Sequence, residues 1–241
     1  MSDPLPWNLL LLLVTTTLLA LPFYPAWSEW RRPRDRETAT AHLPTADAET
    51  QPTLQLAPGA CFGTVNARHL LLGNGPMPAP ADLPALQRWQ PPASARPWGL
   101  HGWHIGHHLD IPANQLVPCS LVVRGRLKTQ GPGRIEGDLK ARDSLHLGPG
   151  TRIQGHLFCE GDIWLGEGCS VSGLVMAEGT LHLAAGVEIG QPDLPVSVCA
   201  DVIEVHGPVL VHGSVQARIG GSVAAGEHVP MNSPHPLKEP T

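Results

Sequence analysis

Four histidines form the densest group of potential metal ligands in the chain. They are His101, His104, His107 and His108. Imidazole nitrogens bind zinc and related ions, and a spacing of three or four residues would gather several of them on one face of a helix. Gly99, Gly102 and Gly106 disfavour a helix in this segment. We therefore interpret it as a solvated loop whose histidines are weak metal candidates, and we predict no bound metal and no cofactor.

No other segment has the pattern of a common catalytic or nucleotide-binding motif. The glycine-rich segment 131–137 is not followed by the Lys-Ser/Thr pair of a phosphate-binding loop. The five cysteines form no CxxC pair, and Cys159 and Cys169 are interpreted as small buried hydrophobic residues. We predict no catalytic residues and expect that the chain is not an enzyme.

An 18-residue repeat is the strongest pattern in the chain. The fold that it predicts would position any functional residue. Apolar residues recur in columns, 18 positions apart. The columns are Ile135, Ile153, Val171 and Ile189; Leu121, Leu139, Leu157 and Val175; and Leu145, Ile163 and Leu181. Gly137, Gly155 and Gly173 recur in step with them. A period this short and strict predicts a solenoid.

The spacing inside one repeat predicts the type of solenoid. Apolar residues come in pairs two positions apart, as in Leu145 and Leu147, which is the spacing of a strand with both side chains on one face. Successive pairs are six residues apart, so a turn of 18 residues holds three short strands. The predicted fold is all-β, a single-stranded triangular β-helix whose rungs lie ~4.8 Å apart and exchange backbone hydrogen bonds.

The repeat predicts a β-helix domain over residues 53–223. A first rung covers 54–73, an insert covers 74–108, and the main rungs cover 109–223, which gives about six or seven rungs. The register slips by a few residues near Gln191. The insert is rich in proline and is expected to be a loop on one face of the solenoid.

Outward positions of the repeat also form columns. One column holds Lys128, His146, Trp164 and His182, and another holds Lys140, Phe158 and Met176. Large apolar side chains that point away from a core need a cover or a partner. We favour a cover, formed by Trp89, Trp98 and Trp103 of the insert; the alternative is a lateral contact patch.

The repeat resembles the core of the bactofilins, a family of polymer-forming bacterial cytoskeletal proteins. The resemblance lies in the form apolar-x-Gly-x-apolar-x-Ala followed by apolar-x-apolar, which is repeated between Arg134 and Gly190. It extends over 109–217 and the isolated rung near Leu54. The resemblance implies a right-handed β-helix and nucleotide-independent, end-to-end assembly into filaments, often beside a membrane. The chain departs from that pattern in its long insert and in the slip before the last rung.

An enzymatic alternative is a hexapeptide-repeat acyltransferase or a γ-type carbonic anhydrase. Both are left-handed β-helices in which a histidine of a loop or interface takes part in the chemistry, and the histidine-bearing insert fits that arrangement. These families repeat a small residue every six positions, whereas the glycines here recur every 18. The structural interpretation is therefore favoured.

The segment from Leu5 to Trp27 contains no charged residue. Trp7 and Trp27 are 20 residues apart, which is ~30 Å in a helix and matches the hydrocarbon thickness of a bilayer. A cleaved signal peptide is the rival interpretation, but the first six residues are not basic and a small-x-small cleavage site is missing. We predict a retained transmembrane helix over 5–27.

Positive charge follows this segment directly. Arg31, Arg32, Arg34 and Arg36 lie on its C-terminal side, and nothing basic precedes it. The positive-inside rule predicts a single-pass protein of the cytoplasmic membrane, with the C-terminal domain in the cytoplasm and the four arginines in contact with anionic headgroups. Residues 28–52 are expected to be a disordered tether, and residues 224–241 a disordered tail.

Self-assembly is the favoured function because a β-helix ends in unpaired strand edges, which are templates for further pairing. We predict a homopolymer whose interface is the last rung, at Val209, Val211, Val215 and Ala217. A net charge of −5 does not favour nucleic acid as a partner. The protein would scaffold cell-envelope or morphogenesis factors; the alternative is a monomeric scaffold that binds a cell-envelope protein through the insert.

Overall fold

The computed structural model describes residues 53–78, 82–99 and 101–224. The segment 5–27, the four arginines at 31–36, the tether and the tail lie outside the described residues, so the predictions made for them remain predictions. In the described part, no helix is long and apolar enough to cross a membrane.

All regular structure in the described ranges is β-structure, and it forms one sheet of 21 strands. The strands are β1 (Thr53–Leu56), β2 (Cys61–Leu72), β3 (Gln87–Arg88), β4 (Arg96–Trp98), β5 (Gly102–Ile105), β6 (Leu109–Ile111), β7 (Gln115–Val117), β8 (Ser120–Val123), β9 (Leu127–Thr129), β10 (Gly133–Ile135), β11 (Leu139–Ala141), β12 (Ser144–Leu147), β13 (Thr151–Ile153), β14 (Leu157–Cys159), β15 (Asp162–Leu165), β16 (Ser170–Val171), β17 (Val175–Ala177), β18 (Thr180–Leu183), β19 (Glu188–Ile189), β20 (Val196–Val205) and β21 (Val209–Val223).

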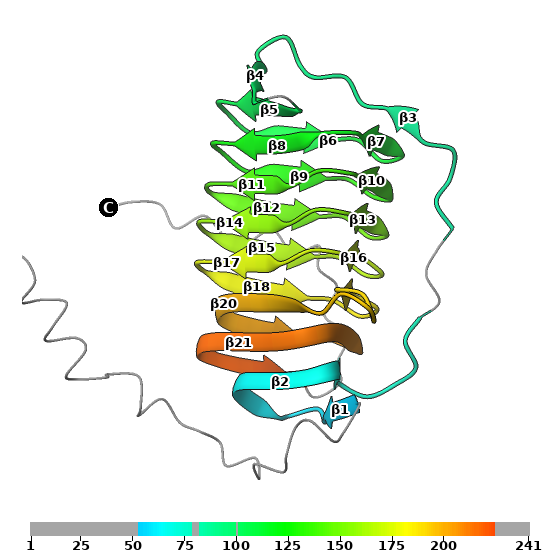
Figure 1. Cartoon of the computed structure of the whole chain (residues 1–241), viewed down its shortest axis with the longest axis vertical. Helices are drawn as coiled ribbons and strands as arrows, with labels where there is room; N and C mark the ends of the chain where they lie inside the picture. Colours follow the sequence, from blue (N-terminus) through cyan, green and yellow to red (C-terminus); the bar gives the residue numbers. More distant parts are fainter. Residues whose placement is uncertain (1–52, 79–81, 100, 225–241) are drawn as a thin grey trace, which may run out of the picture. The chain divides into compact units, whose positions relative to one another are not determined.

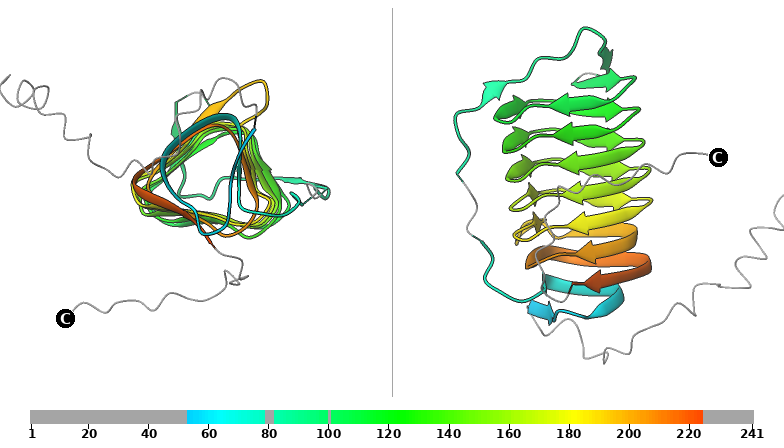
Figure 2. Two further views of the ribbon diagram at one scale, coloured as in Figure 1. Left: turned by 90° about the horizontal axis from the view of Figure 1, so that it is seen from below. Right: turned by 180° about the vertical axis from the view of Figure 1, so that it is seen from behind.

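The strands wind into a triangular solenoid of about nine turns, with about 18 residues in each turn (Figures 1 and 2). In the main rungs, each strand pairs in parallel with the strand one turn later, so Leu139 lies opposite Leu157 and Leu145 opposite Ile163. The predicted all-β solenoid and its 18-residue turn are therefore confirmed. The turns outnumber the six or seven expected, because part of the insert adds strands at one end. The hand of the coil stays a prediction.

Alternation along each strand builds the core. In β14, for example, Leu157 and Cys159 are buried while Phe158 between them is only partly so. The columns read from the sequence are buried along the solenoid, and they form a single cluster. Burial raises the pKa of Cys159 to about 11 and that of Cys169 to about 12, so both thiols are protonated at neutral pH. They are packing residues, as the sequence predicted.

The corners of the triangle are stabilised by side chains that replace the missing strand pairing. Ser120 Oγ accepts a hydrogen bond from the backbone N–H of Asp138, and Asp138 Oδ1 accepts one from the N–H of His156. His156 Nδ1 in turn accepts from the N–H of Leu174. The recurring glycines occupy the same corner: a Cβ on Gly155 would overlap the carbonyl of Gly137 one turn away. Polar residues and glycines at 18-residue spacing are therefore structural here.

The register slip lies where the sequence predicted it. A short loop carries the exposed Leu194, and the bridge between Gln191 and Leu194 closes it. After this loop the strands rejoin the ladder, with Leu181 opposite Ile203 in place of a residue 18 positions later. The extra residues therefore bulge out and leave the core columns continuous.

The first rung lies at the opposite end of the solenoid from the one we expected. The sequence placed it before Leu109, but β2 pairs along its length with β21, the last of the described strands (Figure 1). The pairing is antiparallel, with Leu70 opposite Val211 and Leu72 opposite Val209. Strand β1 then pairs in parallel with β2 and forms the outermost layer. The N-terminal segment therefore caps the C-terminal end.

The antiparallel orientation of this cap has a geometric cause. Along the solenoid axis, the main rungs run toward β21. The chain from β1 to β2 also approaches β21, but from the other side, so it runs along the axis in the opposite direction. Reversing both the direction of travel and the direction of winding leaves the hand of a coil unchanged. The cap can therefore have the same hand as the main rungs only if its strands run antiparallel to β21.

The insert runs along one side of the solenoid and joins the cap to the far end (Figures 1 and 2). Its tryptophans do not cover Trp164. Trp103 of β5 lies opposite Leu121, and Trp89 follows Arg88, which lies opposite Leu116. Both rings therefore close the far end of the core, while Trp98 is 54% exposed. The expectation that the insert covers the outer columns was wrong, because Trp89 and Trp103 pack against the end of the core instead.

A charge in the core should unfold the solenoid. Leu165 is fully buried, so Leu165→Asp should lower the free energy of unfolding by about 3 kcal/mol or more through an unpaired buried carboxylate. Urea denaturation followed by circular dichroism would measure the loss. Met176→Asp is the matched control, because Met176 is 41% exposed and should tolerate the charge. Equal stability of the two variants would contradict this core.

A disulfide should trap the cap on the last strand. Cys61 of β2 and Ser222 of β21 lie directly opposite each other and both are exposed. Opposite residues of antiparallel strands have Cα atoms ~4.5–5.5 Å apart, which suits a disulfide. We expect Ser222→Cys to form an intramolecular bridge to Cys61 on mild oxidation, detected by peptide mass mapping. The double variant Cys61→Ser/Ser222→Cys is the control, and failure of the single variant to bridge would argue against the antiparallel cap.

Candidate functional site

Strand β21, the last strand in the described part of the chain, is not an open end of the solenoid. Val209, Val211 and Val215 are fully buried, and Ala217 is 6% exposed. Strand β21 has β19 and β20 on one side and β2 on the other. The premise that these four residues border a free edge was therefore wrong. The cap covers them because Leu70 and Leu72 extend the same apolar columns by one more layer.

The free edges at this end belong to the cap itself. Among the described strands, β1 pairs only with β2, and residues 61–67 of β2 pair only with β21. Leu54 and Leu56 continue the apolar columns into this outermost layer, since they lie opposite Leu70 and Leu72. The end of the solenoid therefore presents unpaired backbone groups around an apolar centre.

The far end is better protected. Strand β5 is covered by β4, which pairs with it as an antiparallel hairpin. The outer strand of that hairpin contains Pro97, which lacks an N–H, beside the exposed Arg96. Proline and charge are common protections of edge strands. Among the described strands, β6 at this end pairs only with β9, so one side of β6 is unpaired.

The structure separates the four histidines of the insert. His104 and His107 line a hollow of about 310 Å³ together with Ser94, Arg96, Gly106 and Arg124. His108 lies at a corner, where its Nδ1 accepts a hydrogen bond from the backbone N–H of Arg126. His101 is exposed. No three of these four converge as a potential metal-binding group among the described residues.

The outer column that contains Trp164 forms a stack of rings. The His146 and Trp164 rings are 4.1 Å apart and 8° from parallel, and the Trp164 and His182 rings are 4.9 Å apart and 11° from parallel. The rings cover one another's faces, so the stack offers no broad aromatic face to a ligand. Burial, with the positive charges of Arg126 and Lys128, lowers the pKa of His146 to about 4. His146 is therefore neutral at neutral pH.

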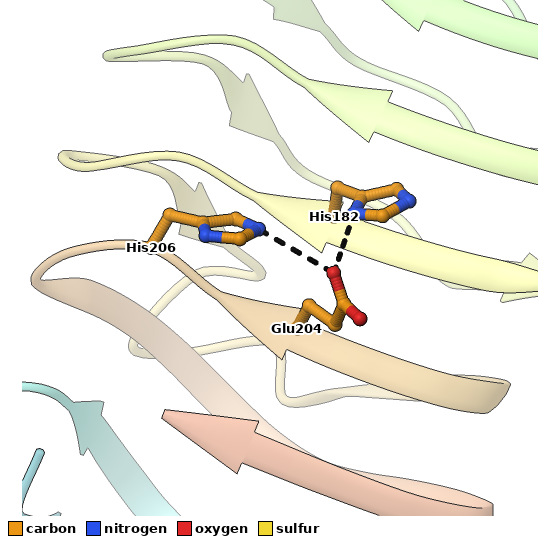
Figure 3. A group of neighbouring side chains, drawn as sticks. All are labelled: His182, Glu204 and His206. Carbon is orange, nitrogen blue, oxygen red and sulfur yellow. Dashed lines mark ion pairs between the residues drawn. The ribbon is translucent and has the colours of Figure 1, made fainter. Parts of the chain in front are cut away.

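The stack ends at a group of three potential ligands (Figure 3). His182 Nδ1 lies 3.0 Å from Glu204 Oε2, and His206 Nε2 lies 3.7 Å from the same oxygen. Strands β18 and β20 pair with His182 opposite Glu204, which brings the residues together. Sequence reasoning found His182 in its column but missed the group, because the slip moves Glu204 out of the 18-residue register. Alternation along Ile203-Glu204-Val205-His206 was the available signal.

A second histidine group joins the cap to the main rungs. His69 Nδ1 of β2 lies 2.8 Å from His212 Nδ1 of β21, and His212 Nε2 lies 3.2 Å from Glu188 Oε1. His212 is 4% exposed. Because its two nitrogens face different partners, the three residues form a chain of hydrogen bonds rather than a convergent site. The group fixes the cap against the last turns.

Comparison with known proteins identifies no relative: no family model, no curated protein and no solved structure matches this chain.

The neutral state of His146 predicts a pH dependence of stability. Its pKa is about 4 in the folded chain and 6.5 ordinarily, so the unfolded chain binds more protons between these values and stability falls as pH drops from 6.5 to 4. After discounting for solvent screening, we expect a contribution of roughly 1–2 kcal/mol. His146→Gln should remove that part of the slope in urea denaturation at pH 4–7.5.

His101→Gln is the control for this measurement, because His101 is exposed and stacks on no ring of the described residues. It should keep the pH slope of the unmodified chain. If His146→Gln leaves the pH dependence of the free energy of unfolding unchanged, the neutral state of His146 does not cause that dependence.

Proposed function

We propose that this chain is a membrane-anchored structural protein that self-associates end to end through its β-solenoid. The anchor is the segment 5–27 predicted from the sequence, with Arg31, Arg32, Arg34 and Arg36 at the cytoplasmic headgroups. The partner in the contact is a second copy of the chain. The assembly scaffolds proteins of the cell envelope and needs no nucleotide.

The unpaired edge of the cap carries this proposal. Strand β1 and residues 61–67 of β2 present rows of backbone N–H and C=O groups with no strand beyond them in the described part of the chain. Such rows pair readily with another strand. Beneath them, Leu54 ends an apolar column and is only partly buried, so a second layer would also bury apolar surface.

The pairing of the cap with β21 is an intramolecular example of the contact proposed between two copies. Strands β2 and β21 belong to segments that travel in opposite directions along the axis, and they pair antiparallel without disturbing the core columns. Two copies that meet cap to cap are related in the same way, by a two-fold axis across the solenoid. An isologous contact of this type satisfies the edges of both copies at once.

Growth beyond a pair of copies requires a second contact at the far end. The unpaired side of β6 is the candidate there, because β4 shields β5 with Pro97 and Arg96. Alternating cap-to-cap and far-end contacts would give a filament without polarity. Several anchors in one assembly would then hold it on a membrane more firmly than a single anchor does.

Lysines on the cap edge should prevent self-association. Thr53 and Thr64 are exposed on β1 and β2, and Thr53→Lys/Thr64→Lys places charges that must be desolvated and that meet their like across a two-fold contact. We expect the full-length chain in mild detergent to sediment as assemblies and the variant as smaller species. Electron microscopy should show elongated particles only for the unmodified chain.

Gln216→Lys/Ser222→Lys is the matched control. It adds the same charge at exposed positions of β21, which is paired on both sides. This variant should assemble like the unmodified chain. If the unmodified chain remains a monomer at high concentration and low salt, the polymer proposal fails and a monomeric scaffold takes its place.

A further inference from the structure

Beyond the assembly surfaces, one group of side chains has the composition of a metal site. We propose that His182, Glu204 and His206 bind a divalent transition-metal ion of the zinc type, with the remaining coordination position left to water (Figure 3). Two imidazole nitrogens and a carboxylate oxygen suit zinc, cobalt or nickel better than calcium or magnesium, which prefer oxygen ligands throughout.

The distances between ligand atoms fit such an ion after small side-chain rotations. Bonds of 2.0–2.1 Å in a tetrahedral zinc site place neighbouring ligand atoms about 3.3 Å apart. Glu204 Oε2 lies 3.0 Å from His182 Nδ1 and 3.7 Å from His206 Nε2, which brackets that value. One ligand atom from each of the three residues lies within 4.8 Å of the other two. The side chains therefore already surround one point.

The fold holds two of the ligands in place before any ion arrives. His182 and Glu204 lie opposite each other on the paired strands β18 and β20. The Trp164 ring stacks on His182 at 4.9 Å and fixes the plane of the imidazole. His206 follows β20 directly and its ring lies 15° from parallel to that of His182. Orientation of ligands by neighbouring groups strengthens metal binding because less freedom is lost.

The proposed site is open to solvent. The nitrogen that faces Glu204 is Nδ1 in His182 and Nε2 in His206. The side chains of His182, Glu204 and His206 are 20%, 41% and 36% exposed, so an ion can reach them from solvent.

The other histidine groups lack this convergence. His212 faces His69 with one nitrogen and Glu188 with the other, so no single point is shared. The insert histidines form no group of three. The chain therefore offers internal controls of matched chemistry for the proposed site.

Zinc titration of the tag-free, full-length chain, freed of metal by a chelator, tests the proposal. Isothermal calorimetry should show one site per chain, and cobalt should give the intense visible absorption of a tetrahedral ion. Glu204→Gln, which keeps the shape of the side chain, and His206→Ala should each weaken zinc binding by at least about tenfold. Replacement of His101, His104, His107 and His108 by Ala should leave affinity and stoichiometry unchanged.

Circular dichroism and melting in chelator would establish that each variant is folded. If a variant does not fold, the cobalt spectrum of the unmodified chain decides, because a tetrahedral His and carboxylate site has a spectrum distinct from that of the free ion. Absence of a stoichiometric site in the unmodified chain would overturn the proposal. So would a site that persists in Glu204→Gln and His206→Ala, or one that is lost with the four insert histidines.

Discussion

Backbone pairing between successive turns is the interaction on which this structure depends. Each strand is only two to four residues long in the regular turns, too short to be stable alone. Pairing in register with the turn before and the turn after places each side chain directly over its equivalent, as with Leu139 and Leu157. Like therefore stacks on like, inside and outside. The core columns, the polar corners and the ring stack are three results of one constraint.

The same constraint creates the problem that the cap addresses. A ladder of turns has two ends, and each end leaves backbone groups and apolar columns open. This chain closes one end with its own N-terminal segment and the other with Trp89, Trp103 and a hairpin. Within the described residues the closure at the cap is incomplete, because β1 becomes a new edge. An end that is covered by one more strand layer, rather than by a helix, remains able to accept another strand.

The outer columns contain polar and aromatic side chains that are not needed for packing of the core and are therefore available for binding. Stacking at 18-residue spacing aligns His146, Trp164 and His182 with no contribution from local sequence motifs. The bulge after β19 then shifts the following turn and brings Glu204 opposite His182. An irregularity in the repeat, which leaves the core columns intact, thereby changes which polar side chains meet on the surface.

The amino-acid sequence was sufficient to predict the solenoid, its period, its inward columns and the place of the slip. These features depend on spacing along the chain, and a strict repeat converts spacing directly into neighbours. The first rung was recognised as a rung for the same reason, through Leu54, Leu56, Leu70 and Leu72. The histidines of the insert stay weak metal candidates, and only His104 and His107 among them line a common hollow.

The position of the first rung and the convergence of surface residues could be seen only in the folded chain. Alternation with a period of two reads the same in both directions, so it cannot distinguish parallel pairing with Leu109 from antiparallel pairing with β21. The buried state of Val211, the role of Trp89 as an end closure and the approach of Glu204 to His182 all follow from such choices. Each depends on contacts between residues that are not neighbours in the chain. Such contacts form where they bury apolar area and pair the edges of strands.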